Sequence, residues 1–223
     1  MRLVVLGASG GVGRHLVARG VQAGHAVTVY ARPSTTIDAG SRCVRVVRGD
    51  LADARALAGA LEGADAVLSS VGMQRRDPRN PWSSSTSPAD LCEGAARCIV
   101  AAMRETGVRR VVAVSAAGVA DSAPRLNLVM RFFLATTMIG AAYRDLARME
   151  AVFAESGLDW LAPRPTRLTA GIAGADVRVV EAFGAMDAIA REDVARWMLD
   201  ALLDPAWPAP SWGGRTPQIT AAR

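Results

Sequence analysis

The chain of 223 residues contains no lysine, because all 26 of its basic residues are arginine. Lysine is the usual Schiff-base former and a common partner of catalytic tyrosines, so mechanisms that need a lysine amine are excluded. The chain also has only two histidines and two tyrosines, Tyr30 and Tyr143.

Cysteine is scarce too. Cys43, Cys92 and Cys98 are odd in number and lack the spacing of a metal site or a redox pair. We expect buried free thiols, no metal centre and a reducing, cytoplasmic location.

Long hydrophobic runs are also missing. The longest apolar stretch, residues 128–143, is interrupted by Arg131 and is too short and mixed for a membrane helix. Because Met1 and Arg2 lead directly into an apolar strand, we expect no signal peptide and no membrane partner.

The formal charge of +5 comes from arginines scattered among 21 acidic residues, with no basic helix and no stacking aromatics beside them. This pattern does not favour nucleic-acid binding. The hydrophobic content of 51% and the length predict one globular domain over residues 1–223. We expect a monomer or a homodimer.

A glycine-rich turn follows the first apolar strand, residues 2–6. Its spacing is G-x-x-G-x-x-G, with Gly7, Gly10 and Gly13 at the fixed positions. Such a turn aims backbone N–H groups and a helix N-terminus at a dinucleotide diphosphate, although a plain loop between core elements is the alternative. The other residues of the turn expected at the cofactor are Ser9, Gly11, Val12 and Arg14.

The second strand, residues 26–31, ends without the acidic residue that would accept from NAD ribose hydroxyls. Arg32 follows it instead, with Ser34 and Thr35 close behind. Because a guanidinium pairs well with a phosphate, Arg32 predicts NADP(H) as the cofactor. The alternative is an ordinary surface arginine.

Strands and helices then alternate along the chain, which predicts an α/β fold: a Rossmann-like, doubly wound parallel sheet in a single domain. Ser70, Val71 and Gly72 follow the fourth strand and are expected to face the cofactor. The remaining expected strands are residues 43–47, 66–70, 110–115, 158–162 and 217–220, and the expected helices are residues 11–23, 51–61, 87–106, 143–156 and 192–203.

Two segments are candidates to cover a substrate. Residues 73–88 form a long polar loop after a central strand, interpreted as a flap that uses Arg75 or Arg76, or else as a disordered surface loop. Residues 118–142 are apolar on too many sides for a surface helix. They could wall an apolar pocket, form a dimer face or lie buried in the core.

Two further stretches are specific: residues 92–103 running into 107–113, and residues 148–150 running into 155–160 and then 164–165. Together with the glycine turn they resemble the atypical short-chain dehydrogenases of the NAD(P)H-binding, NmrA-like group, most closely the biliverdin-IXβ reductase/flavin reductase branch. The resemblance covers nearly the whole chain and implies a Rossmann fold and a nicotinamide cofactor. It also implies that Asp50, followed by Leu51, contacts the adenine. From the residues alone, Asp50 is also the expected N-cap of helix 51–61.

The catalytic residues of that superfamily are incomplete here. Ordinary members use a serine, a tyrosine and a lysine four residues after the tyrosine, but Tyr143 is followed at that spacing by Ala147. Ser115 and Tyr143 remain the candidate catalytic residues, unless Ser115 is a buried serine bonded to the backbone and Tyr143 a core tyrosine.

A flat, electron-poor ring stacked on nicotinamide can accept hydride without such a triad. We therefore expect an NADPH-dependent oxidoreductase acting on a flavin, a quinone or a similar small aromatic substrate. Its slot would be lined by Gly72, Ser115, Ala116, Pro165 and Thr166. The alternatives are a non-catalytic NADP(H)-binding redox sensor, and an epimerase or dehydrogenase that uses Tyr143. Because Ala116 and Glu150 replace the Ser and His of the biliverdin-IXβ branch, a tetrapyrrole substrate is not assumed.

Overall fold

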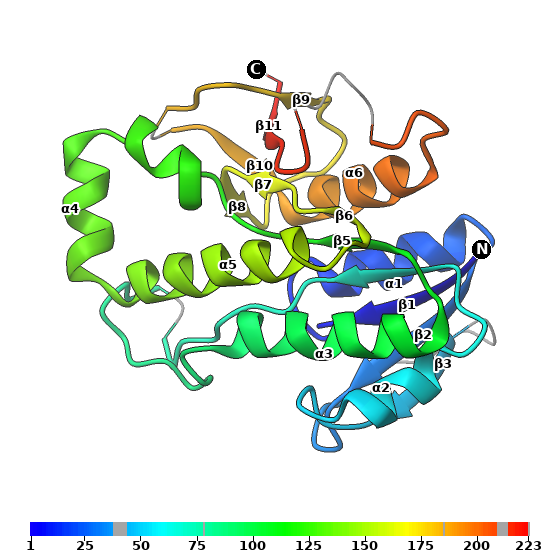
Figure 1. Cartoon of the computed structure of the whole chain (residues 1–223). Helices are drawn as coiled ribbons and strands as arrows, with labels where there is room; N and C mark the ends of the chain where they lie inside the picture. The colour runs from blue at the N-terminus through cyan, green and yellow to red at the C-terminus, as the bar shows by residue number, and fades with distance from the viewer. Residues whose placement is uncertain (38–43, 78, 185, 209–213, 223) are drawn as a thin grey trace.

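The computed structural model describes residues 1–37, 44–77, 79–184, 186–208 and 214–222. Its centre is a sheet of six parallel strands in the order β3-β2-β1-β4-β5-β6 (Figure 1). This is the strand order of a Rossmann fold, so the predicted fold class is confirmed. The strands are β1 (Arg2–Leu6), β2 (Ala26–Ala31), β3 (Val44–Arg48), β4 (Ala66–Ser69), β5 (Arg110–Ala113) and β6 (Asp159–Leu161).

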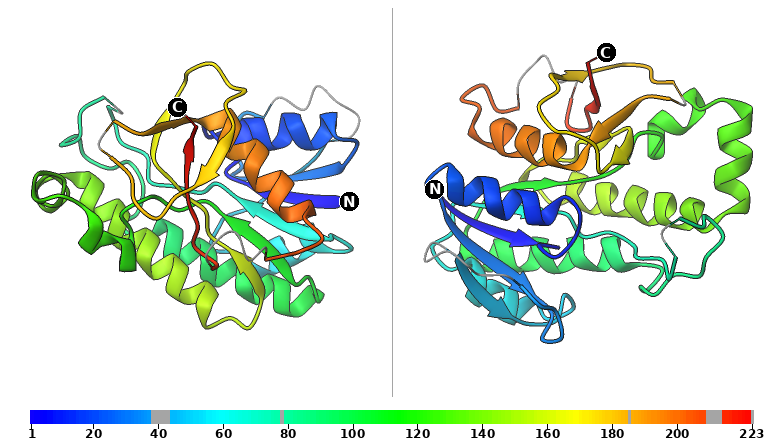
Figure 2. Two further views of the ribbon diagram at one scale, coloured as in Figure 1. Left: turned by 90° about the horizontal axis from the view of Figure 1, so that it is seen from above. Right: turned by 180° about the vertical axis from the view of Figure 1, so that it is seen from behind.

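Helices cover both faces of this sheet, as the two views in Figure 2 show. Alternate residues of β1 separate the two hydrophobic layers: Leu3 and Val5 pack on one side, and Val4 and Leu6 on the other. The first layer includes α1 (Gly13–Gln22) and α6 (Arg191–Leu203), and the second includes α2 (Ala54–Leu61), α3 (Leu91–Thr106) and α5 (Met138–Ala154).

Two small sheets lie beyond β6, in the upper part of Figure 1. In one, β8 (Arg167–Thr169) pairs in parallel with β10 (Ala188–Ala190). In the other, β11 (Gln218–Ala221) lies between β7 (Arg164–Pro165) and β9 (Val177–Val179). Only β11 was expected from the sequence, because strands of two or three residues show no measurable alternation.

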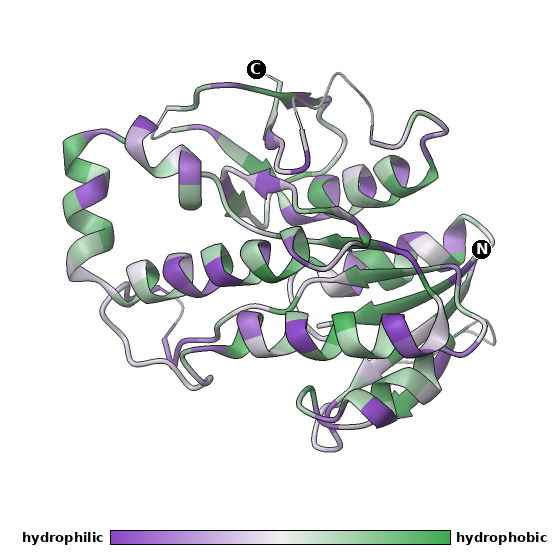
Figure 3. Ribbon diagram, viewed as in Figure 1, coloured by the Kyte–Doolittle hydropathy of each residue, from purple (hydrophilic) through white to green (hydrophobic). Residues whose placement is uncertain are grey.

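The segment between β5 and α5 projects from the edge of the molecule. It contains a short 3₁₀ helix, η1 (Ala120–Arg125), and α4 (Leu128–Thr136), which stands apart in Figure 1. Figure 3 shows that α4 is largely hydrophobic, yet none of its residues is buried. The interpretation of a helix buried in the core is therefore wrong.

Helix α2 begins three residues later than expected. The Asp53 carboxylate caps it by accepting from the backbone N–H of Ala56 at 2.9 Å. Asp50, the expected cap, instead accepts from the N–H of Ala52 at 2.8 Å, in the turn before the helix. Asp50 therefore shapes the loop, and its expected capping role belongs to Asp53.

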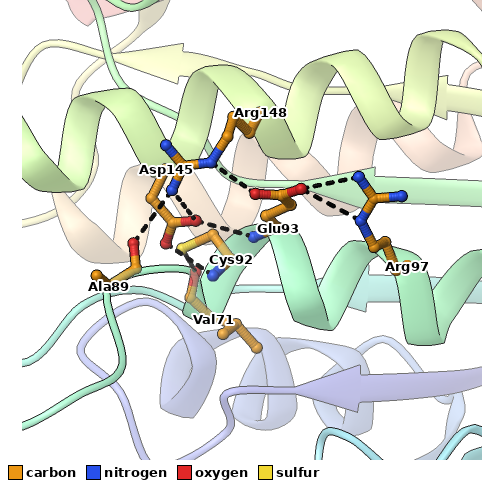
Figure 4. Close-up of polar contacts among 7 residues, drawn as sticks. All are labelled: Val71, Ala89, Cys92, Glu93, Arg97, Asp145 and Arg148. Atoms are coloured by element: carbon orange, nitrogen blue, oxygen red, sulfur yellow. Dashed lines mark hydrogen bonds and ion pairs between the residues drawn. The ribbon is translucent and has the colours of Figure 1, made fainter.

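Helix α3 begins at Leu91 and not at residue 87, and its cap comes from another helix. The side chain of Asp90 makes no capping bond. The buried Asp145 of α5 accepts from the N–H groups of Cys92 at 2.8 Å and Glu93 at 3.0 Å (Figure 4). Asp145 thereby holds the start of α3 against α5, which begins five residues before the expected start.

In the part of the chain that the structure describes, no helix is both long and apolar enough to cross a membrane. The same residues contain no group of three or more His, Cys, Asp or Glu side chains placed to hold a metal ion. Cys92 is free and buried, whereas the free Cys98 is only half-buried. Cys43 lies outside the described residues.

Candidate cofactor and acceptor site

The residues expected at the cofactor lie at the ends of successive strands. The glycine turn follows β1, Arg32 follows β2, Asp50 and Leu51 follow β3, and Ser70 to Gly72 follow β4. Because all these strands are parallel, their carboxyl ends meet at one edge of the sheet. Rossmann folds bind ligands at this edge, beside the point where the strand order reverses between β1 and β4.

Close packing explains the first and third glycines of the turn. Gly7 has a φ of +74°, and a Cβ there would lie 2.7 Å from the carbonyl carbon of Ser70. A Cβ on Gly13 would lie only 2.1 Å from the Gly7 carbonyl oxygen. The Ser70 hydroxyl donates to that same oxygen at 3.2 Å, and the N–H of Gly10 donates to it at 2.9 Å. Ser70 thus fastens β4 to the turn.

No side chain neutralises the N-terminus of α1. Val12, its N-cap residue, provides no side-chain hydrogen bond, and the first turn contains no acidic residue. The first N–H groups of the helix therefore keep their partial positive charge unneutralised by side chains. Together with the glycine cradle, this end fits the diphosphate of a dinucleotide. Arg14, in the first turn, and Ser9 are exposed beside it.

An arginine that the sequence reasoning missed lies against this turn. Arg191, the first residue of α6, covers Gly11 so closely that a Cβ on Gly11 would fall 2.5 Å from the Arg191 Cδ. A side chain at position 11 would require the Arg191 side chain to move. Since the two residues are far apart in sequence, only the packing of α6 on α1 could show the contact.

Arg32 lies in an exposed loop that a second arginine holds in place. Arg48, at the end of β3, donates to the carbonyl oxygen of Arg32 at 3.2 Å and also to that of Thr35. The side chains of Arg32 and Ser34 are exposed at this corner. The loop therefore presents cationic and hydroxyl groups that fit a 2′-phosphate, and Arg48 is a supporting residue that the sequence did not reveal.

The loop at Asp50 is supported by a buried tyrosine. The Tyr30 hydroxyl donates to the Asp50 carbonyl oxygen at 2.8 Å. Burial, reinforced by the charges of Asp53 and Asp50, raises the pKa of Tyr30 to about 12, so it remains a neutral donor. Gly49 gives the ring room, because a Cβ there would lie 2.1 Å from the hydroxyl oxygen. The Asp50 side chain stays exposed at the edge of the sheet.

A cavity of about 610 Å³ lies beside the cofactor edge. Five residues expected at the site line it: Ser115, Ala116, Tyr143, Pro165 and Thr166. Both candidate covering segments contribute to its walls, while Gly72 and Val71 are not among the lining residues. The contributions of these segments are mostly apolar: Met73, Arg75, Leu126, Met130, Phe133, Leu134, Met138, Ile139 and Ala142.

The polar segment 73–88 is an ordered arm in its described residues. The N–H of Thr86 donates to the Gln74 carbonyl at 2.8 Å, which closes the arm on itself. Its tip contacts the other covering segment, because the Pro81 carbonyl accepts from the N–H of Met138 at 3.2 Å. The arm is therefore not the disordered loop considered as an alternative. Its Arg75 lines the cavity, whereas Arg76 is exposed and not among the lining residues.

Ser115 belongs to a buried polar network at the cavity floor. Its hydroxyl donates to Oε1 of Glu150 at 2.5 Å. Arg164 donates to both oxygens of the same carboxylate, through Nε at 3.0 Å and Nη2 at 2.6 Å, and also pairs with Asp121 at 2.7 Å. The Ser115 side chain is thus bonded to Glu150 and not to the backbone as the alternative held. Sequence reasoning missed this role of Glu150.

Tyr143 lacks the surroundings of a catalytic tyrosine. It lines the cavity from α5 and is half-buried. Burial raises the pKa of its hydroxyl, and Ala147 stands one turn away where a lysine would lower it. Among the described residues, no hydrogen-bond partner holds the hydroxyl in place. Tyr143 therefore faces the cavity without a described neighbour that would activate its hydroxyl.

These features define a Rossmann-fold protein with a dinucleotide edge and an adjoining apolar cavity. Residues 7–205 match the family described as NAD(P)H-binding. The chain belongs to this NAD(P)H-binding family, and the NAD(P)H-binding family expected from the sequence is confirmed.

Solved structures with the same fold are similar at low sequence identity. A short-chain dehydrogenase/reductase from Veillonella parvula in complex with NADP is 20% identical, with a TM-score of 0.76 over 98% of this chain and 93% of that chain. The anaerobilin reductase ChuY from Escherichia coli O157:H7 is 21% identical, with a TM-score of 0.76 over 98% and 96%. The oxidoreductase YlbE from Lactococcus lactis is 17% identical, with a TM-score of 0.78 over 100% and 92%.

Proposed function

We propose that the protein is an NADPH-dependent reductase that passes a hydride to a flat aromatic acceptor such as a flavin or a quinone. The observation that carries this proposal is the apolar cavity at the cofactor edge, which contains neither an activated tyrosine nor a lysine. A carbonyl substrate needs a proton delivered to its oxygen as hydride arrives, whereas an electron-poor ring does not depend on one.

Charge supports NADPH over NADH. Arg32 stands where an acidic residue would select NAD, and Arg14 lies at the start of α1. A structural neighbour carries NADP in its crystal structure. We propose that Arg32 pairs with the 2′-phosphate, that the α1 N-terminus holds the diphosphate with Arg191 beside it, and that Asp50 accepts from the adenine.

The chain's own residues would position the reactants and exclude water. The bound nicotinamide supplies the hydride, and no protein group needs to bond to the acceptor. Pro165 and Thr166 line one wall of the cavity, and the apolar side chains of Met130, Phe133 and Met138 line the cover. Burying a flat ring against these side chains holds it in stacking geometry and removes water from the transfer path. Solvent can supply the proton afterwards.

A specific observation also favours the alternative of a redox sensor that binds NADP(H) and signals through a partner. Leu128, Val129 and Phe132 of α4 are 78%, 79% and 71% exposed, an unusual grouping of apolar side chains on one helix. The sensor would bind NADPH without turnover. The epimerase or dehydrogenase alternative gains no such support, because nothing near Tyr143 activates it.

Oxidation of NADPH, followed by its own absorbance, tests the proposal. We expect enzyme-dependent loss of NADPH with at least one of FMN, riboflavin and menadione, and much slower loss with NADH. The matched control is the Gly13→Ala variant, whose turn should not accept the cofactor. Tight NADPH binding with no oxidation by any of the three acceptors would favour the sensor.

A further inference from the structure

We infer that Ser115 presents a hydrogen-bond acceptor to the cavity, so that the site selects an aromatic ring carrying an N–H donor over a quinone. The inference rests on the proposed function and narrows the class of aromatic compound that would receive the hydride. It reverses the role that a serine plays in ordinary short-chain dehydrogenases, where the hydroxyl donates to a substrate oxygen.

The single proton of the Ser115 hydroxyl determines which hydrogen bonds this side chain can offer to a ligand. A serine hydroxyl has one proton and two lone pairs. That proton is directed at Glu150 Oε1, at an oxygen–oxygen distance of 2.5 Å, the range of a charge-assisted bond. Only lone pairs then remain on the oxygen for a ligand in the cavity that Ser115 lines.

The surrounding network keeps the hydroxyl in this orientation. Glu150 accepts three hydrogen bonds, one from Ser115 and two from Arg164, and all three side chains are buried. A guanidinium has no acceptor atom, so the carboxylate is the acceptor throughout. The main chain of Ser115 is fixed as well, because its N–H donates to the Pro163 carbonyl at 2.8 Å. Turning the hydroxyl toward a ligand would remove one of the three hydrogen bonds that the buried Glu150 carboxylate accepts.

This polarity distinguishes the proposed acceptors. The oxidised ring of a simple flavin such as lumiflavin carries one N–H, at N3, between two carbonyl groups. A quinone carries carbonyl oxygens and no donor, so at Ser115 it would place lone pairs against lone pairs. Such an unpaired contact at the buried Ser115 hydroxyl weakens binding, whereas an N–H fits the Ser115 oxygen.

Binding of two flavins that differ by one methyl group tests the inference. We would titrate lumiflavin and 3-methyl-lumiflavin against the protein holding NADP⁺, which has no hydride to give, and follow flavin fluorescence. The expected result is that lumiflavin binds tighter by roughly three- to tenfold, the usual effect of one hydrogen bond. In Ser115→Ala the ratio of the two flavins' dissociation constants should fall to about one. The oxygen that accepts the hydrogen bond is then gone, while the shape of the site is almost kept.

Two further variants separate polarity from shape. Thr166→Val removes another hydroxyl from the same cavity, one that is bonded to Thr220 at 3.0 Å, and should leave the ratio unchanged. Glu150→Ala frees the Ser115 proton, so the ratio should fall and menadione should bind more tightly. If Glu150→Ala does not fold, the comparison of Ser115→Ala with Thr166→Val still decides the question.

Equal binding of the two flavins by the unaltered protein would overturn the inference, as would a preference that persists in Ser115→Ala. The outcome is separable from that of the proposed function. If the protein discriminates between the flavins but does not oxidise NADPH, the assignment of Ser115 as a hydrogen-bond acceptor is supported and the proposed reductase function is refuted. If it oxidises NADPH but binds both flavins equally, the reductase function is supported and the assignment of Ser115 is refuted.

Discussion

The indole of Trp82 meets the ring of Phe133 edge-on, with the ring centroids 6.2 Å apart and the planes at 77°. This contact joins the arm of residues 73–88 to α4. Phe133 also lines the acceptor cavity, so the arm and α4 form one cover over it. The cover depends on few contacts, because Trp82 remains 63% exposed.

Loss of this aromatic contact should loosen the cover. We expect Trp82→Ala to raise KM for the acceptor by about two- to tenfold, the effect of one aromatic pair, with little change in NADPH affinity. Phe132→Ala is the matched control, since Phe132 is on the same helix and 71% exposed. Equal effects of the two substitutions on KM would show that the contact does not hold the cover.

Arg32→Ala tests the choice of cofactor. Loss of a charge-assisted hydrogen bond to phosphate should weaken NADPH binding by roughly 10- to 100-fold and leave NADH binding nearly unchanged. Fluorescence titration of each cofactor measures this directly. Arg55→Ala, at an exposed position on α2, provides the control. Equal losses for NADPH and NADH would refute the 2′-phosphate assignment.

Tyr143→Phe tests whether any proton passes through the tyrosine. Because burial raises the pKa of Tyr143 and no described residue activates it, we expect kcat to change by less than about twofold. A fall of 100-fold or more in kcat, with KM unchanged, would instead assign Tyr143 a catalytic role. That result would revive the epimerase or dehydrogenase interpretation.

The space around Gly13 and around Gly94 predicts opposite outcomes for Gly→Ala substitutions at these two positions. In Gly13→Ala the new methyl would lie 2.1 Å from the Gly7 carbonyl oxygen, so we expect NADPH binding to be lost and stability to fall. In Gly94→Ala, inside α3, the methyl would meet nothing within 4 Å. There the higher helix propensity of alanine should stabilise the protein by about 0.5–1 kcal/mol. Thermal unfolding and NADPH titration of both variants measure these effects.

Asp121 should make stability depend on acidic pH. Its hydrogen bond and ion pair with Arg164 lower the pKa of its carboxyl, so folding is stabilised above the unfolded pKa of about 4 and that stability is lost as pH falls through the folded pKa. Asp121→Asn should therefore lower Tm at pH 7, and this deficit should shrink as the pH falls below about 4. Asp200→Asn, at an exposed position on α6, is the control. A deficit that persists unchanged at pH 3 would contradict this explanation.

The sequence predicted the parts of the fold that local patterns specify. Apolar runs revealed the central strands, and glycine spacing revealed the turn after β1. Local patterns could not predict contacts between residues distant in sequence, such as the cap that Asp145 provides for α3 and the approach of Arg191 to Gly11.

In the candidate site, too, local patterns predicted some residues, whereas contacts between distant residues could not be predicted. Ser115 was expected because it follows a strand, but its bond to Glu150 exists only once α5 packs beside β5 and places the carboxylate there. The covering role of residues 118–142 was one of three open alternatives, because an apolar helix pattern does not tell a core face from a cavity wall.

Single-turnover oxidation of bound NADPH tests the central claim most directly. The protein would be loaded with NADPH deuterated at either face of nicotinamide C4 and mixed rapidly with lumiflavin while the absorbance of NADPH is followed. Direct hydride transfer in a fixed stack predicts slower oxidation with the deuterium at one face and an unchanged rate with it at the other. Bound NADPH that persists after mixing, or a rate that neither label changes, would contradict the account.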